Sequence, residues 1–285
     1  MRKKKNRDEE EIIIGYNTKK KKDKPPKKKD KKSKRKKKNT WRKVKKVLLL
    51  LLKIILIIGI LAGIGAFLFV SPVFNITEIR VENSNKISEN TYISLSEIQI
   101  GENIFRISKS KIIEQIKQES YVENVEVKRE YPGTVVITVT ERTPAYMIEK
   151  NGEMYAYIDK NGYNLETTTQ ALDIPILKGT ITDIENLETG ARISDEDLSK
   201  FNDLIRIMDG IKNNNIQEKL LSVDISDDKN YILEFKNSNK KVILGDTSEL
   251  STKMLWIKYF MEKSEEEAGT VHLNDIENVY FEPTR

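Results

Sequence analysis

A long apolar run at residues 47–70 constrains this chain more than any other feature. Its sequence, VLLLLLKIILIIGILAGIGAFLFV, holds 24 residues and a single charge. At 1.5 Å per residue, a helix of this length crosses a hydrocarbon core of about 30 Å. The one charge, Lys53, lies one to two turns inside the run, from where its side chain can extend to the headgroups. The run predicts one transmembrane helix that ends before Ser71 and Pro72.

Basic and aromatic residues just before the run predict its orientation. Such a collar is typical of the cytoplasmic side of a membrane, so we expect the N-terminus inside the cell and the residues after Ser71 outside. A cleaved signal peptide is the alternative, but its apolar core spans only about 7 to 15 residues. The predicted membrane-interface residues are Trp41, Arg42, Lys43, Lys45, Lys46 and Lys53.

The segment that precedes the run is strongly basic, whereas the rest of the chain is acidic. Residues 1–46 hold 24 Lys and Arg against 6 Asp and Glu, which gives this segment a net charge of +18. Because the whole chain has a net charge of +6, residues 47–285 have a net charge of 6 − 18 = −12. Charge repulsion and scarce apolar side chains predict a disordered tail over residues 1–46. The tail either solubilises and orients the chain or contacts anionic lipids of the inner leaflet. Specific nucleic-acid binding is not expected, because only Tyr16 and Trp41 could stack on bases.

Residues 74–142 alternate in a way that predicts a small module of strands and helices. Residues 74–81 are compatible with a strand that leaves the membrane. Ser88 is a good helix N-cap, and Ser108 or Ser110 caps a second short helix. Alternating apolar residues over 125–131 and 135–139 flank Pro132 and Gly133, which predicts a hairpin. The expected order is strand, helix, helix, strand, strand.

Residues 143–285 predict a second module of strands with flanking helices. Short strands are expected on both sides of the turn at residues 151–152, and further strands at 221–225, 231–235 and 241–244. Ser194 begins a helix with acidic residues at its positive end, and a later helix follows from Leu250. The first of these helices is predicted to bury one stripe, made of Leu198, Phe201, Leu204, Ile205, Met208 and Ile211. The external part is therefore predicted to be an α+β fold, with a mixed or antiparallel sheet in the second module.

The order of these elements resembles the FtsQ/DivIB family of cell-division proteins. The resemblance lies in the turn YPGTV at residues 131–135, the exit ERTPA at residues 141–145, and the closing segments GTVHL at 269–273 and VYFEP at 279–283. It implies a βααββ POTRA domain over residues 74–142 and a β domain over residues 143–285. The lysine-rich tail is most like the DivIB members of Gram-positive bacteria.

The resemblance also implies a function and a partner-binding surface. Members are membrane scaffolds at the division septum, where a terminal strand and the preceding helix bind a bitopic pair of the DivIC/FtsB and FtsL types. A strand at a sheet edge suits this role, because a partner can extend it. His272 stands where an acidic residue is expected. The contacts predicted for this chain are Val279, Tyr280, Phe281, Trp256 and Tyr259.

Catalysis is not expected from this composition. The chain has no cysteine and a single histidine, His272, so neither a thiol nucleophile nor an ordinary zinc site is predicted. Nucleotide-binding and nucleophile-elbow motifs are absent from the sequence, and no cofactor is implied. The acidic runs at residues 227–228 and 265–267 are typical of solvated loops. The alternatives are a membrane-tethered cell-wall enzyme or ligand receptor, and a POTRA protein of a transport or insertion system.

Overall fold

The computed structural model describes residues 31–236, 239–263 and 267–284. The first element, α1 (Lys31–Val70), includes a stretch from Trp41 to Val70 that is long and apolar enough to cross a membrane. It ends at Val70, the last residue of the predicted span. The chain divides into two units after Ile64, and each is described by itself.

The helix α1 begins upstream of the predicted span and corrects part of the tail prediction. Residues 31–46 were expected to be disordered, yet they are helical. Lys and Arg are good helix formers, and extending an existing helix adds one hydrogen bond per residue without a new nucleation cost. The predicted disorder of residues 1–30 lies outside the described residues.

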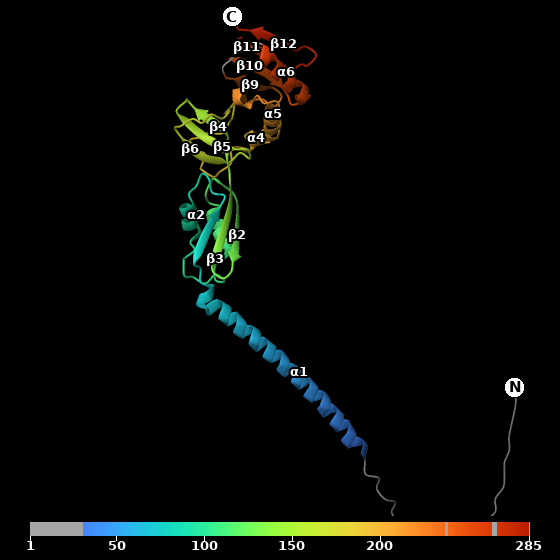
Figure 1. Cartoon of the computed structure of the whole chain (residues 1–285). Coiled ribbons are helices and arrows are strands. Elements are labelled where there is room, and N and C mark those ends of the chain that lie inside the picture. Colours follow the sequence, from blue (N-terminus) through green and yellow to red (C-terminus); the bar gives the residue numbers. More distant parts are fainter. Residues whose placement is uncertain (1–30, 237–238, 264–266, 285) are drawn as a thin grey trace, which may run out of the picture. The chain divides into compact units, whose positions relative to one another are not determined.

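The first module after α1 has the predicted βααββ order (Figure 1). Its sheet has the order β1-β3-β2, in which β1 runs parallel and β2 antiparallel to β3. The expected strand at residues 74–81 begins only at Glu78, because Ser71 caps a 3₁₀ turn just before it. The elements are η1 (Pro72–Phe74), β1 (Glu78–Glu82), α2 (Glu89–Ser96), α3 (Lys109–Ile116), β2 (Val122–Glu130) and β3 (Thr134–Glu141).

Both helices of this module begin at predicted serine caps and cover a common core. The hydroxyl oxygen of Ser88 accepts a hydrogen bond from the N–H of Thr91, and that of Ser108 accepts one from the N–H of Lys111. Each cap satisfies one of the donors left free at a helix start. The core below the helices is fully enclosed and includes Tyr92, Ile104, Ile116, Val135 and Ile137.

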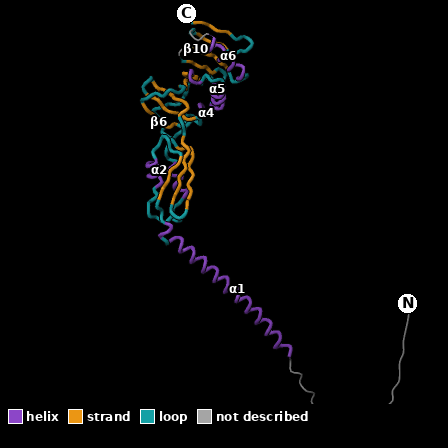
Figure 2. The backbone as a smooth tube through the Cα atoms, in the orientation of Figure 1, coloured by secondary structure: helices purple, strands orange, loops and turns teal. Residues whose placement is uncertain are grey.

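The second module is built on one nine-stranded mixed sheet (Figure 2). The strand order is β12-β11-β10-β9-β8-β7-β4-β5-β6. The pairs β4·β7, β7·β8 and β10·β11 are parallel, and the others are antiparallel. Its strands are β4 (Pro144–Lys150), β5 (Met154–Asp159), β6 (Asn164–Thr168), β7 (Ile176–Lys178), β8 (Leu220–Asp224), β9 (Tyr231–Phe235), β10 (Lys240–Gly245), β11 (Gly269–His272) and β12 (Tyr280–Pro283).

The helices of the second module are α4 (Asp195–Ser199), α5 (Phe201–Asn213) and α6 (Leu250–Lys263), and a short turn η2 (Gln217–Lys219) precedes β8. Ser194 caps α4 as predicted. The buried stripe differs from the prediction: Ile207 is buried and Ile205 is 38% exposed. Phe201, Leu204 and Ile211 are buried as predicted. Ile207 lies three residues from Leu204 and four from Ile211 and so shares their face, whereas Ile205 lies at the edge of that face.

Candidate partner-binding surface

The terminal strand β12 lies at one end of the nine-stranded sheet. It pairs with β11, and within the described residues no strand pairs with its other side. The N–H of Thr284 donates to the carbonyl oxygen of Ala268 at 2.9 Å. Because backbone groups alternate sides along an antiparallel strand, the groups of Phe281 and Pro283 point away from β11. Proline has no N–H, so the open side of β12 offers one donor, the N–H of Phe281, beside the carbonyl oxygens of Phe281 and Pro283.

The two faces of β12 lie in different surroundings. Phe281 stacks on Phe260 of α6, with ring centroids 6.1 Å apart and an interplanar angle of 25°. Its neighbour Tyr280 is 53% exposed and stacks on His272, with centroids 4.2 Å apart. Nε2 of His272 lies 3.4 Å from Oε2 of Glu282. Val279 is half-buried against the core. Tyr280 and Phe281 therefore project from opposite faces of the sheet.

Helix α6 contributes an exposed aromatic face that joins β12 through one residue. Trp256 is 37% and Tyr259 is 41% exposed, and their rings meet edge to face at 5.7 Å. Phe260 contacts both rings and also Phe281. The structure thus brings together Trp256, Tyr259 and Phe281, three of the residues that are predicted to contact a partner. It places the fourth aromatic residue, Tyr280, on the other face of the sheet.

Two residues of this surface were missed by the sequence analysis, Phe260 and the 62% exposed Leu255. Phe260 follows Trp256 by four residues, a spacing that places two side chains on the same helical face, so the signal was present. We use the name aromatic face for Leu255, Trp256, Tyr259, Phe260 and Phe281. Exposed aromatic side chains of this kind are enriched at protein interfaces.

The opposite face of α6 fixes the helix on the sheet. Met254, Ile257 and Met261 are buried in the core. Lys253 is 1% exposed, and its ammonium donates to the carbonyl oxygen of Asp246 at 2.9 Å. A buried ammonium is tolerated only when it is hydrogen-bonded in this way. The aromatic face is therefore held on a rigid element.

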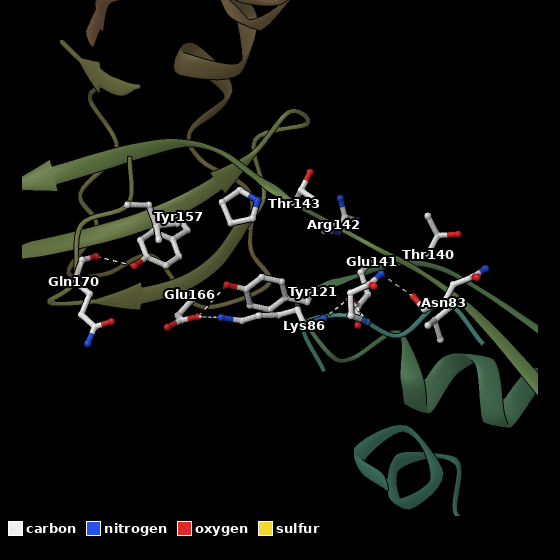
Figure 3. A pocket seen from close by; sticks show the side chains of 14 residues that line it. Asn83, Lys86, Tyr121, Thr140, Glu141, Arg142, Thr143, Tyr157, Glu166 and Gln170 are labelled. Carbon is white, nitrogen blue, oxygen red and sulfur yellow. Dashed lines mark hydrogen bonds and ion pairs between the residues drawn. The ribbon is translucent and has the colours of Figure 1, made fainter. Parts of the chain in front are cut away.

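A cleft of about 620 Å³ lies between the two modules that follow α1 (Figure 3). It is the feature that an enzyme or receptor hypothesis would use, since Lys86, Glu141, Arg142 and Glu166 line it. Its charged groups already have partners. Glu166 accepts from the hydroxyl of Tyr121 at 2.9 Å and from the ammonium of Lys86 at 3.3 Å.

Glu141 and Arg142 are also occupied. Glu141 accepts hydrogen bonds from the N–H groups of residues 85–87 and from the hydroxyl of Tyr92. Burial alone would raise the pKa of Glu141, but these donors outweigh it and the pKa is lowered. Such a carboxylate is not a proton donor near neutral pH. Arg142 Nη1 lies 2.6 Å from Oδ2 of Asp159. The cleft therefore carries the ties between the modules.

The described part of the chain holds no cluster of three or more His, Cys, Asp and Glu side chains that could bind a metal ion. The sequence prediction named no catalytic, cofactor or metal residue. The predicted collar and Lys53 lie in α1, where Trp41 is 66% exposed and the ammonium of Lys45 lies 4.5 Å from its ring centroid.

Comparisons with known proteins agree with the two-module division. Residues 74–142 match the family model "POTRA domain, FtsQ-type", and residues 143–282 match "FtsQ/DivIB, C-terminal related". The chain is 31% identical over 185 residues to "Cell division protein DivIB" of Clostridium acetobutylicum, covering 64% of this chain and 72% of that one. It is 26% identical over 200 residues to the protein of the same name from Clostridium tetani, covering 70% and 73%. "Cell division protein FtsQ" of Syntrophotalea carbinolica is 29% identical over 147 residues, covering 51% and 50%.

Proposed function

Because the chain belongs to the FtsQ/DivIB family of cell-division proteins, we propose that it is a bitopic membrane scaffold that binds other division proteins through the C-terminal end of its large sheet. In this proposal α1 crosses the cell membrane, the N-terminus is cytoplasmic, and the external modules work at the division septum. The family is one of cell-division scaffolds and not a known enzyme family. A single apolar helix fits a single-pass protein.

The observation that supports the binding role is the open side of β12 next to the aromatic face. A partner strand can add to the N–H and carbonyl of Phe281, because edge strands accept this kind of extension. A helix with an apolar stripe can pack on Leu255, Trp256 and Tyr259. We propose that the partner is a pair of the DivIC/FtsB and FtsL types, and that the complex helps to assemble or regulate septal peptidoglycan synthesis.

The test measures binding of the external parts of a DivIC/FtsL-type pair to the full chain in nanodiscs. Trp256→Glu places a charge in the centre of the aromatic face, and we expect affinity to fall by about thirtyfold, as for a loss of about 2 kcal/mol at an interface hot spot. Tyr280→Glu tests the opposite face of β12, which we expect to matter less. Unchanged affinity of Trp256→Glu would contradict the assigned surface.

The matched control is Ile181→Glu, because Ile181 is 57% exposed and lies away from α6 and β12 in a loop of the second module. Its affinity should equal that of the unmodified chain. Fluorescent fusions of the same three variants supply a second readout in cells. Loss of mid-cell enrichment with Trp256→Glu alone supports the proposal, and uniform envelope fluorescence of the unmodified fusion contradicts the septal role.

A further inference from the structure

The base of the first external module carries an apolar surface that the fold leaves uncovered. We name it the basal patch and define it by Phe69, Val70, Val73 and Tyr131. Their side chains are 47%, 72%, 64% and 59% exposed, respectively. Large exposed apolar surfaces on a folded domain usually mark a site of interaction with a protein or a membrane.

The basal patch is one continuous surface, although its residues are up to 62 positions apart in the sequence. Phe105, which is half-buried, connects them: its ring lies 5.9 Å from that of Phe69 and is stacked on Tyr131 at 5.3 Å. Phe74 meets the same ring edge to face at 5.2 Å. Aromatic contacts therefore run from the end of α1 to the β2–β3 turn.

Polar contacts fix the segments that form the patch. The side-chain amide of Asn103 donates to the carbonyl oxygen of Leu68 at 3.0 Å, and it is nearly buried. The N–H of Ile104 donates to the carbonyl of Phe74, and the N–H of Thr77 donates to that of Gly133, both at 2.8 Å. These bonds join the segment after α1 to the loop before α3 and to the β2–β3 turn.

Gly133 is required for this close approach. A Cβ atom at this position would lie 2.4 Å from the carbonyl oxygen of Asn75, which is far inside van der Waals contact. The base is therefore built as one block, and its exposed apolar side chains belong to a defined surface.

Chain continuity identifies what covers the patch. Val70 is the last residue of the predicted membrane span, and Val73 follows it by three residues. Aromatic residues are enriched where a membrane meets water, because their rings suit the headgroup level. Arg106 of the neighbouring loop is exposed and offers a cation to lipid phosphates.

We propose that the basal patch inserts into the headgroup region of the leaflet from which α1 emerges, so that the first module binds the lipid surface directly. The bound partner is the bilayer itself, held by Phe69, Val73 and Tyr131. The module is then attached to the membrane by α1, which includes Phe69 and Val70, and separately by Val73 and Tyr131, so its base cannot swing freely about the residues that follow Val70.

The test uses single-cysteine labels on the full chain, which has no cysteine of its own. Tyr131→Cys and Val73→Cys are labelled with an environment-sensitive fluorophore and reconstituted in vesicles of phosphatidylcholine and phosphatidylglycerol. A fraction of the lipid carries a nitroxide quencher at headgroup depth in both leaflets. We expect several-fold stronger quenching, and emission at shorter wavelength, for both labels than for a label outside the patch.

The matched control is Asn85→Cys. Asn85 is exposed and its N–H binds Glu141, at the end of β3 farthest from the β2–β3 turn. Seven residue steps of strand separate it from the base, which is about 23 Å. Two label positions are used because a label at Tyr131 could disturb the fold. Val73 lies outside the strands and the buried core, so a label there leaves the fold intact.

Three outcomes would overturn the inference. The first is equal quenching at residues 131, 73 and 85. The second is a shift to shorter wavelength without lipid quenching that disappears when the protein is diluted in lipid, since this indicates a second copy on the patch. The third is emission at the long wavelength typical of water for a label at Leu56→Cys, in the middle of the predicted span, which would remove the membrane anchor together with this inference.

Discussion

The two ends of the nine-stranded sheet are treated differently by this fold. At the β6 end, the N–H of Asn164 donates to the carbonyl oxygen of Ala191, and the carbonyl of Leu165 accepts from the hydroxyl of Ser120 in the first module. At the β12 end no described strand or loop pairs with the outer side. One edge is partly covered by the chain itself, and the other is open within the described residues.

The two outer strands, β6 and β12, differ in how their unpaired backbone groups are protected. Unpaired strand edges are a liability that proteins normally cover or block. The first residues of β6 are covered by the loop at residues 190–191 and by Ser120 of the first module, whereas the β12 end is only short and interrupted by Pro283.

The largest expected effect comes from removing Arg142, whose side chain binds Asp159 at the end of β5, next to β6. Its guanidinium is 13% exposed and binds the carboxylate of Asp159, which is 2% exposed, and it also lies 3.9 Å from the ring centroid of Tyr163. Arg142→Ala leaves the buried Asp159 charge without its cation, while Oδ1 of Asp159 still accepts from the N–H groups of Asn161 and Tyr163, and we expect a loss of about 3 kcal/mol in the free energy of unfolding. Urea unfolding measures it.

The control for this variant is Lys150→Ala. Lys150 pairs with Asp183 at 3.1 Å, but both side chains are more than a third exposed, so removing the pair should cost about 0 to 1 kcal/mol. Equal losses for the two variants would show that the Arg142 pair is not a structural tie between the modules.

A smaller effect is expected at Glu141, which fixes the loop before α2. Glu141→Gln keeps the shape but replaces an acceptor oxygen by an amide, and we expect a loss of about 1 to 3 kcal/mol at pH 7. Because the folded-state pKa is lowered from 4.5, the stabilisation is complete above that pH and is lost as pH falls through the folded-state pKa. Unfolding followed from pH 7 down to acid should therefore show the two proteins converging; a constant difference would contradict the role of the charge.

The smallest effect is expected at Pro283, on the open side of β12. Pro283→Ala adds an outward N–H to β12, and one hydrogen bond contributes about 0.5 to 1.5 kcal/mol. We expect a modest rise in self-association of the full chain in vesicles, measured by energy transfer between separately labelled copies, with unfolding unchanged. A decrease in self-association would show that Pro283 contributes a contact and does not block one.

Local signals in the sequence predict the elements well, because each depends on neighbouring residues. Ser88, Ser108 and Ser194 all cap helices, and the β2–β3 hairpin follows alternation around Pro132 and Gly133. The predicted stripe of the helix after Ser194 is wrong at its margin, where Ile205 is 38% exposed and Ile207 is buried, because periodicity gives the direction of a buried face more reliably than its width.

The arrangement of the sheet could not be predicted in the same way. The parallel pairs β4·β7 and β10·β11 join segments far apart in the chain, and no local pattern encodes such pairing. The candidate surface was predicted in part. Trp256, Tyr259 and Phe281 meet, but the opposite orientation of Tyr280 follows only once the register of β12 is fixed. The predicted binding roles of these residues remain predictions.

The single outward N–H of β12 has a consequence for crowding. Sheets that grow into fibres need a row of donors and acceptors that each added chain renews. An added strand can accept a hydrogen bond from the N–H of Phe281, but Pro283, two residues further on, has no N–H to donate. Addition therefore stops after a short segment. Edge-to-edge growth of one copy on another is therefore disfavoured at β12.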